Sequence, residues 1–471
     1  MANCNIQIVF QTLVSNFFQP FRMSKKLSLL CLFCISFIGN SIAQLRTSPA
    51  YLNQNKAWVD SVFATLSPDE KIAQLIMVAA VSDTKRSVIG TQFTNPEYVE
   101  KLIKEHKVGG IVFFQGGPVP QATLTNRFQA VSKVPLLIAM DAEFGLAMRI
   151  DSTVRYPYQM TLGAIQGNDN LIYDMGSQLA RQAKRLGVHI NFAPVADINN
   201  NPNNPVISFR SFGENKYQVA QKALSYMKGM QDNGLLTSAK HFPGHGDTGV
   251  DSHYDLPLIP FSKGRLDSLE LYPFKVLLNH GLGGVMIAHL SIPAYDKTPN
   301  LPSTLSKPIV TSLLRERLGY EGLIYSDAMN MKGVVKYFPD GKADAMGLEA
   351  GMDILEFTED VNKSIAEIKK SIAEGKITQA EIDAKCKRVL EAKAWAGLNH
   401  WKPVELKNLV PDLNPKEAEL TNRLLTEKAL TILKNDHDLL PLQQLDTLKI
   451  ASVSIGSDSI TTFQRTLSLY T

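Results

Sequence analysis

Short apolar runs alternate with amphipathic segments between about residue 70 and residue 395 of the chain. The apolar runs predict eight strands, and the amphipathic segments between them predict helices. The predicted strands cover residues 72–78, 109–114, 135–140, 189–194, 237–239, 284–288, 322–325 and 352–356. The clearest helical patterns cover residues 171–186, 216–233, 308–318 and 361–374.

Eight strand-then-helix units over roughly 300 residues are the number and length of a (β/α)8 barrel of the TIM type. A doubly wound open parallel sheet is the alternative α/β fold. Polar residues follow the strands at a constant place: Asp141 and Glu143 after the third, Asp197 after the fourth, Lys240 and His241 after the fifth, His289 after the sixth, Asp327 after the seventh. In a barrel these strand ends meet at one face, where catalytic groups lie. This convergence indicates an enzyme.

The tail, residues 401–471, has a different pattern. Residues 414–433 predict one amphipathic helix that begins near Asn414 and Pro415, residues 439–442 predict a turn, and residues 449–453 predict a buried strand. One helix and one or two strands cannot bury a core of their own. We therefore predict a barrel over residues 50–400, and over residues 401–471 a linker and the truncated start of a C-terminal α/β domain.

The N-terminal region is typical of a targeting segment. A short basic stretch begins at Met23, an apolar run covers residues 27–39, and a small-x-small site at residues 41–43 precedes Gln44. This order predicts a secretory signal peptide that starts at Met23, with residues 1–22 as an upstream extension. Residues 1–43 would then be absent from the mature protein. A longer genuine leader and a retained membrane anchor are the alternatives.

Composition limits the class of protein. The chain has 471 residues, 44% of them hydrophobic and 20% charged, as in ordinary soluble globular proteins. The net charge of +4 is spread without a basic block, so nothing indicates a nucleic-acid partner. Of the 4 cysteines, only Cys386 lies beyond the predicted leader, which leaves no intrachain disulfide. An exported protein of this kind fits a bacterial envelope, in the periplasm or secreted, without stable membrane insertion after signal cleavage.

The segment from Lys240 to His253 contains three histidines, and its glycines and proline predict a loop. Asp251 and His253 are two residues apart, so both side chains project to the same side of an extended segment. A carboxylate beside an imidazole makes a tuned general acid/base. Zinc accepts the same types of ligand, but Lys240 beside His241 would repel a cation. We predict no metal and no cofactor, and expect His245 and Asp247 to shape the loop.

Other candidate residues have two readings each. Asp327 directly follows a strand, where it is either a helix N-cap or a rigidly held nucleophile. Asp141 with Arg149 is either a surface ion pair or part of a site, and Arg210, between Phe209 and Phe212, is either structural or functional. Carboxylates and cations gathered around one pocket suit the dense hydroxyl groups of a sugar.

Over roughly residues 60–400 the chain resembles glycoside hydrolase family 3, specifically its β-N-acetylglucosaminidase (β-hexosaminidase) branch. The motifs that carry the resemblance are Lys240-His241-Phe242-Pro243-Gly244-His245-Gly246 with Asp251-Ser252-His253, Asn191-Phe192-Ala193-Pro194-Val195-Ala196-Asp197, Arg210-Ser211-Phe212-Gly213 and Tyr325-Ser326-Asp327. Residues 429–435 and 439–442 resemble the opening of the family's C-terminal α/β sandwich domain. The chain departs from the family pattern at Ala142 and Phe144, within an expected Asp-Gln-Glu-Gly-Gly, and at Ala328, where a second Asp is usual.

The resemblance implies a (β/α)8 barrel and retaining hydrolysis of terminal β-linked N-acetylglucosamine, from peptidoglycan fragments or related amino-sugar glycans. It implies that Asp327 is the nucleophile and that His253, oriented by Asp251, is the acid/base. The residues implied to hold the sugar are Asp141, Arg149, Arg210, Lys240 and His241. The alternatives are a β-glucosidase or xylosidase of the same family, a metal-dependent hydrolase and a non-catalytic glycan-binding protein.

Overall fold

The computed structural model describes residues 47–82, 93, 95–167, 169–250, 255–456 and 458–470. The predicted upstream extension and signal peptide, residues 1–43, lie outside the described residues. Among those that are described, no helix has the length and apolar character needed to cross a membrane. Cys386 is a buried free thiol.

Eight parallel strands form a closed barrel. They are β1 (Ile76–Val81), β2 (Gly110–Phe114), β3 (Leu137–Met140), β4 (Ile190–Asn191), β5 (Leu236–Phe242), β6 (Gly284–Ile287), β7 (Leu323–Ser326) and β8 (Leu355–Glu356). Their order is β7-β6-β5-β4-β3-β2-β1-β8, and a parallel bridge from Tyr325 to Ile354 joins the two ends. The barrel prediction is confirmed, and the open sheet is excluded because the bridge from Tyr325 to Ile354 closes the sheet between its two ends.

Several predicted strand boundaries were wrong, and three of the differences have a clear local reason. The first strand begins at Ile76, because residues 72–73 complete helix α4 (Pro68–Ala73), which Ser67 and Glu70 start with a capping box. The fourth strand ends at Asn191, three residues before Pro194, which has no N–H to donate to a neighbouring strand. The fifth strand continues to Phe242, so Lys240 and His241 lie on a strand and the loop starts only at Pro243.

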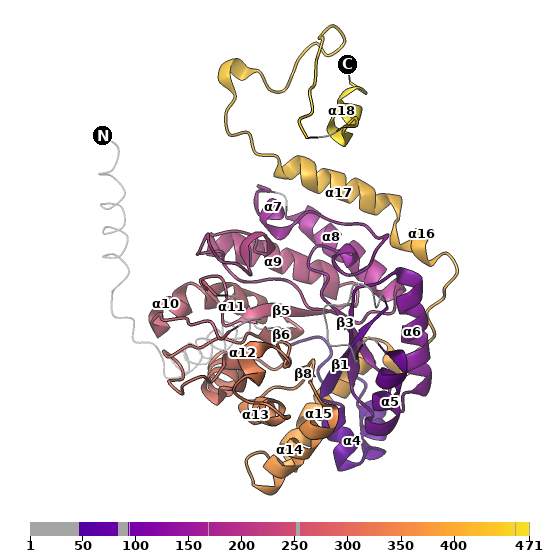
Figure 1. Cartoon of the computed structure of the whole chain (residues 1–471), viewed down its shortest axis with the longest axis vertical. Coiled ribbons are helices and arrows are strands. Elements are labelled where there is room, and N and C mark those ends of the chain that lie inside the picture. Colours follow the sequence, from indigo (N-terminus) through magenta and orange to yellow (C-terminus); the bar gives the residue numbers. More distant parts are fainter. Residues whose placement is uncertain are drawn as a thin grey trace, which may run out of the picture.

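The helices surround the barrel, as Figure 1 shows. Their bounds are α3 (Lys56–Ala64), α5 (Pro96–His106), α6 (Pro118–Val131), α7 (Gln159–Gly163), α8 (Asn170–Arg185), α9 (Lys216–Gln231), α10 (Lys263–Ser268), α11 (Leu271–Asn279), η6 (Pro308–Arg317), α12 (Lys332–Val335), α13 (Lys342–Ala350), α14 (Val361–Ala373) and α15 (Gln379–Trp395). The four helices predicted most clearly correspond to α8, α9, η6 and α14. The element η6 is a π-helix.

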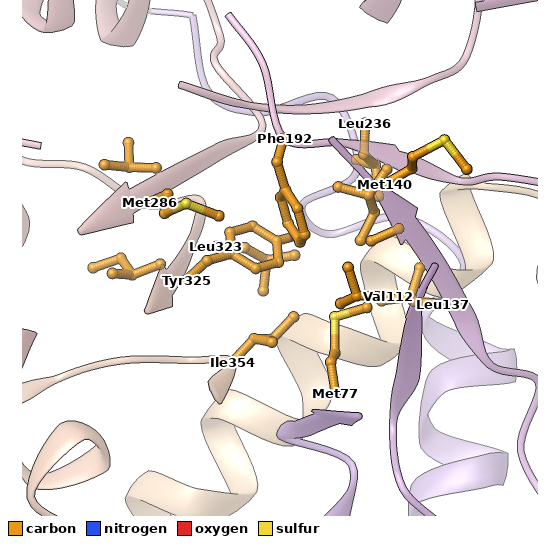
Figure 2. Packing of buried hydrophobic residues seen from close by; sticks show 14 of the residues in the cluster. Met77, Val112, Leu137, Met140, Phe192, Leu236, Met286, Leu323, Tyr325 and Ile354 are labelled. Atoms are coloured by element: carbon orange, nitrogen blue, oxygen red, sulfur yellow. The ribbon is translucent and has the colours of Figure 1, made fainter. Parts of the chain in front are cut away.

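The barrel interior is a packed apolar core. Side chains of Met77, Phe192 and Tyr325 point toward one another between the strands (Figure 2). The rings of Phe192 and Tyr325 meet edge to face, with centroids 5.5 Å apart. Burying each such aromatic side chain contributes about 1.5–3 kcal/mol. This core supports the polar side chains that follow the strands.

The tail leaves the barrel along α8. Helices α16 (Leu409–Leu413) and α17 (Lys416–Ala429) pack there, and Gln178 donates a hydrogen bond of 2.6 Å to Thr421. The predicted helix is confirmed but ends at Ala429. Beyond it the chain extends away from the barrel to α18 (Thr462–Leu467) (Figure 1).

The predicted strand at 449–453 was wrong: this segment has no strand structure, and Val453 is 89% exposed. A strand requires a neighbour for its N–H and C=O groups, and among the described residues no other strand lies beside this segment. The domain boundary near residue 400 stays a prediction.

Candidate functional site

A cavity of about 550 Å³ lies at the carboxyl ends of the barrel strands. Six of the predicted site residues line it: Asp141, Arg149, Arg210, Lys240, His241 and Asp327. The cavity is also lined by Phe114, Glu143, Met148, Val206, His245, Met286, Ala328, Asn330, Met331, Lys332, Glu356 and Phe357. The two other predicted residues, Asp251 and His253, lie outside the described residues.

Five charged side chains form a continuous network on one wall of this cavity. Lys240 Nζ lies 2.7 Å from Asp141 Oδ1 and 2.8 Å from Glu143 Oε1. Arg149 donates to Asp141 Oδ2 at 2.6 Å, and Arg210 donates to both oxygens of Glu143, at 2.7 and 3.0 Å. Bidentate guanidinium–carboxylate contacts fix the orientation of both groups. The network therefore holds the two carboxylates rigidly, and Arg149 and Arg210 belong to the site.

Electrostatics keep these carboxylates ionised. Burial by itself would raise the pKa of Asp141, but Lys240 and Arg149 together lower it far below its usual range. Burial also opposes ionisation of Glu143, yet Arg210 and Lys240 bring its pKa down to about 2. The two carboxylates in turn raise the pKa of Lys240 against the effect of burial. At neutral pH the wall thus presents carboxylate acceptors held by cations, an arrangement able to bind sugar hydroxyl groups.

Asp197 organises the end of β5 and the loop that follows it. Its Oδ2 accepts hydrogen bonds from the backbone N–H of His241 at 3.0 Å and lies 2.6 Å from His241 Nδ1, and its Oδ1 accepts from the N–H of His245 at 2.7 Å. Because Nδ1–H donates to Asp197, Nε2 of His241 is left as an acceptor, and Arg210 Nη2 lies 3.2 Å from it. Asp197 therefore fixes the tautomer of His241.

Asp327 lies at the end of β7 with its carboxyl group on the cavity. Its N–H donates to Ile287 O at 3.0 Å, and its Oδ1 accepts from the N–H of Ala328 at 2.8 Å. The next helix, α12, has Met331 as its N-cap. The helix N-cap reading of Asp327 was therefore wrong. A carboxylate held in this way by a strand end is suited to attack a fixed carbon atom.

Sequence reasoning assigns no site role to four buried polar residues at or beside the cavity. It identifies Glu143 and Asp197 at strand ends without a role, and it places Glu356 within a strand. His245 was expected to shape the loop, but it lines the cavity, and burial together with the nearby His241 lowers its pKa to about 4. Asp247, the other residue expected to shape the loop, pairs with Arg265 at 2.5 Å.

The described part of the site does not have the form of a metal centre. Among the described residues no three His, Cys, Asp or Glu side chains are grouped as they would be around a metal ion. The ammonium group of Lys240 lies between Asp141 and Glu143, so these two carboxylates already have a cation as their partner. The donor set thus suits a hydroxyl-rich ligand better than a cation.

Comparisons with known proteins agree with the fold. The family described as "Glycosyl hydrolase family 3 N terminal domain" matches residues 67–392. "Beta-hexosaminidase A" of Pseudoalteromonas piscicida is 32% identical over 331 residues, which cover 64% of this chain and 55% of that protein. "Beta-N-acetylglucosaminidase/beta-glucosidase" of Cellulomonas fimi is 28% identical, over 82% of this chain and 68% of that protein.

A solved structure is similar over much of the chain. The glycoside hydrolase family 3 β-N-acetylglucosaminidase from Paenibacillus sp. str. FPU-7 superposes with a TM-score of 0.71 and 33% identity, covering 79% of this chain and 70% of that one. The chain thus spans little more than half the length of the Pseudoalteromonas relative. Because the family match covers most of the chain and includes all eight strands, the chain belongs to glycosyl hydrolase family 3, whose N-terminal barrel domain it contains.

Proposed function

We propose that this chain is a retaining glycoside hydrolase that releases terminal β-linked N-acetylglucosamine. The observation that supports this most is the position of Asp327, a carboxylate fixed at a strand end, on the same cavity as the ionised pair Asp141 and Glu143. The name of the Paenibacillus relative contains this sugar, and the name of the Pseudoalteromonas relative contains the wider class of hexosaminides.

The proposed reaction has two steps. Asp327 attacks the anomeric carbon while His253, oriented by Asp251, gives a proton to the leaving oxygen. His253 then removes a proton from water, and the resulting attack breaks the bond between Asp327 and the sugar. Asp141, Arg149, Arg210, Lys240 and His241 would hold the sugar meanwhile. In retaining glycosidases with two carboxylates, the catalytic groups are about 5–5.5 Å apart.

The network on the cavity wall narrows these binding roles. Both oxygens of Asp141 face a cation, yet each carboxylate oxygen has a further lone pair that can accept from a hydroxyl. Lys240 and Arg210 use hydrogen-bond donors to bind Asp141 and Glu143. A large part of their role in sugar binding is therefore to orient these two carboxylates. Of these residues, we therefore propose Asp141 as the main direct contact to the sugar.

The test is hydrolysis of an aryl β-N-acetylglucosaminide by the purified protein. Asp327→Asn should lower kcat at least about 1,000-fold, because no covalent intermediate can form. With a good aryl leaving group, His253→Ala should still form the glycosyl-enzyme but hydrolyse it slowly, so intact-mass spectrometry should detect the adduct on Asp327. Asp344→Asn, a buried carboxyl on α13 outside the cavity, is the matched control.

Two results would contradict the assignment. One is an Asp327→Asn variant with more than about a tenth of the wild-type kcat, since a true nucleophile cannot be spared. The other is a preference for the aryl β-glucoside over the N-acetylglucosaminide, which would favour the β-glucosidase reading that the printed name of the Cellulomonas relative includes.

The location and natural substrate belong to the same proposal. The signal-peptide pattern supports export to the periplasm or the medium, and peptidoglycan fragments are the amino-sugar glycans met there. The exported protein should begin at Gln44, which N-terminal sequencing of envelope and culture fractions would check. Release of N-acetylglucosamine from peptidoglycan fragments should exceed release from chitin oligomers, and the reverse order would contradict that substrate.

A further inference from the structure

Glu356 is a buried carboxyl group on the cavity that the proposed mechanism does not use. It ends β8, lines the cavity and is 4% exposed. Its backbone is held on both sides, because its N–H donates to Ser326 Oγ at 2.9 Å and its carbonyl accepts from the N–H of Met329 at 2.8 Å. Its Oε2, in contrast, has no hydrogen-bond partner among the described residues. A buried polar atom without a partner costs about 1–3 kcal/mol, so a carboxyl group in this state on a cavity is a candidate for contact with a ligand.

The charges around Glu356 decide which form of the group meets that ligand. Burial, followed by repulsion from Asp141 and Asp327, raises the pKa of Glu356 well above its usual range. Lys240 and Arg149 act in the opposite direction, but both are already paired with Asp141. A shift in this direction favours the protonated carboxyl group, which is a hydrogen-bond donor as well as an acceptor.

We propose that Glu356 contacts the sugar in the cavity and donates a hydrogen bond from its carboxyl group to a hydroxyl oxygen of that sugar, an inference that rests on the proposed glycosidase function. A hydroxyl that donates its proton to Asp141 keeps two lone pairs able to accept. The neighbouring carboxylates of Asp141, Glu143 and Asp327 accept only, so a neutral acid among them supplies the complementary donor.

Two substitutions separate donation from charge. Glu356→Gln keeps an uncharged donor of similar shape, and it should leave kcat/KM on the aryl N-acetylglucosaminide within about threefold of wild type. Glu356→Met removes the donor, and it should lower kcat/KM by about 10- to 100-fold, the equivalent of one unmade hydrogen bond to a buried group. Glu356→Met should nonetheless fold, because it replaces an unpartnered polar group by an apolar one.

A deoxy-glycoside series identifies the contacted hydroxyl. On the substrate that lacks the contacted hydroxyl, wild type should have a lower kcat/KM than on the complete substrate. The kcat/KM of Glu356→Met should not fall further on this substrate, because the variant has already lost the hydrogen bond to that hydroxyl. On the other deoxy substrates Glu356→Met should keep its full defect. Affinity for N-acetylglucosamine, measured by calorimetry, needs no turnover and should weaken in Glu356→Met but not in Glu356→Gln or in the control Asp344→Asn.

The outcomes are distinct from those that test the proposed function. If wild type does not cleave the aryl N-acetylglucosaminide, the proposed function fails, and the same comparison is made on whichever β-glycoside the protein does cleave. Glu356→Met that binds sugar as tightly as wild type would overturn the role of Glu356. If kcat/KM falls equally in Glu356→Gln and Glu356→Met, hydrogen-bond donation is not the reason for the role of Glu356.

Discussion

Replacing Lys240 by Met should destabilise the barrel strongly, and more so at high pH than at low pH. Lys240 is 2% exposed, and its ammonium lies within 2.8 Å of both Asp141 and Glu143. Without it, two buried carboxylates face each other with fewer cations. Removing one partner of a buried ion pair costs about 3–5 kcal/mol, because the remaining charge is left uncompensated.

The pH dependence follows from the direction of the pKa shifts. In wild type the pKa of Glu143 is lowered from 4.5 to about 2, which corresponds to about 3 kcal/mol of stability present above pH 4.5 and lost as pH falls through 2. Arg210 and Lys240 are the cations responsible. In Lys240→Met the pKa values of Asp141 and Glu143 should rise, so protonation would relieve their repulsion. The stability gap should therefore be widest near pH 8 and narrower near pH 4.

A second buried lysine offers the matched control. Lys393 on α15 is 0% exposed, and its Nζ donates to Gln74 Oε1 at 2.6 Å. Burial lowers its pKa from 10.5 to about 7, so wild type gains stability as pH rises from 7 toward 10.5. Lys393→Met removes a buried charge rather than half of an ion pair. It should be at least as stable as wild type at pH 6, although Gln74 loses a partner.

The assay is urea unfolding followed by tryptophan fluorescence and far-UV circular dichroism at pH 4, 6 and 8. The reasoning is refuted if Lys240→Met unfolds at the wild-type urea concentration at pH 8. It is equally refuted if the gap between Lys240→Met and wild type is no smaller at pH 4 than at pH 8. A Lys393→Met variant as unstable as Lys240→Met would show that filling volume, not ion pairing, decides both results.

Three further changes test other parts of the structure. Burial raises the pKa of Asp344 from 3.8 to about 6, so wild-type stability should fall by up to about 3 kcal/mol as pH rises from 4 to 6. Asp344→Asn should make thermal melts less dependent on pH in this range, and an unchanged dependence would contradict the shift. Asp197→Asn replaces one acceptor oxygen and should misorient His241, lowering kcat/KM about 10- to 100-fold; wild-type kinetics would exclude this role. In Gly246→Ala the new Cβ would stand 1.6 Å from the carbonyl oxygen of Ile198, so melting temperature and activity should both drop, and normal values for both would show that the loop can shift freely.

The eight strands were predictable because each is a run of apolar residues in a chain where every strand is buried. The predicted strand boundaries were wrong where the apolar pattern does not determine where a strand begins or ends. Lys240 and His241 interrupt the apolar pattern, yet they lie on β5 because the network and Asp197 satisfy their polar groups. The strand predicted at 449–453 failed because pairing depends on a distant partner, which a local pattern cannot reveal.

The site was predictable to the extent that strand ends converge. That rule brought Asp141, Lys240 and Asp327 to one cavity, and the structure places them there. It could not show that Glu143 is the second arm of the Lys240 network, or that one oxygen of Glu356 is left without a partner, since both depend on side-chain geometry. The roles of Asp251 and His253 stay predictions.

The cavity wall also constrains how this protein can change over generations. Positive and negative side chains alternate along one chain of contacts, in the order Arg149, Asp141, Lys240, Glu143 and Arg210. Each of the three middle residues therefore pairs with two neighbours of opposite charge. A single substitution that alters one of these charges would leave a buried ion without its partner. Viable lineages should therefore alter these positions in compensated pairs, and a graft of this cavity wall onto another barrel would have to move all five residues together.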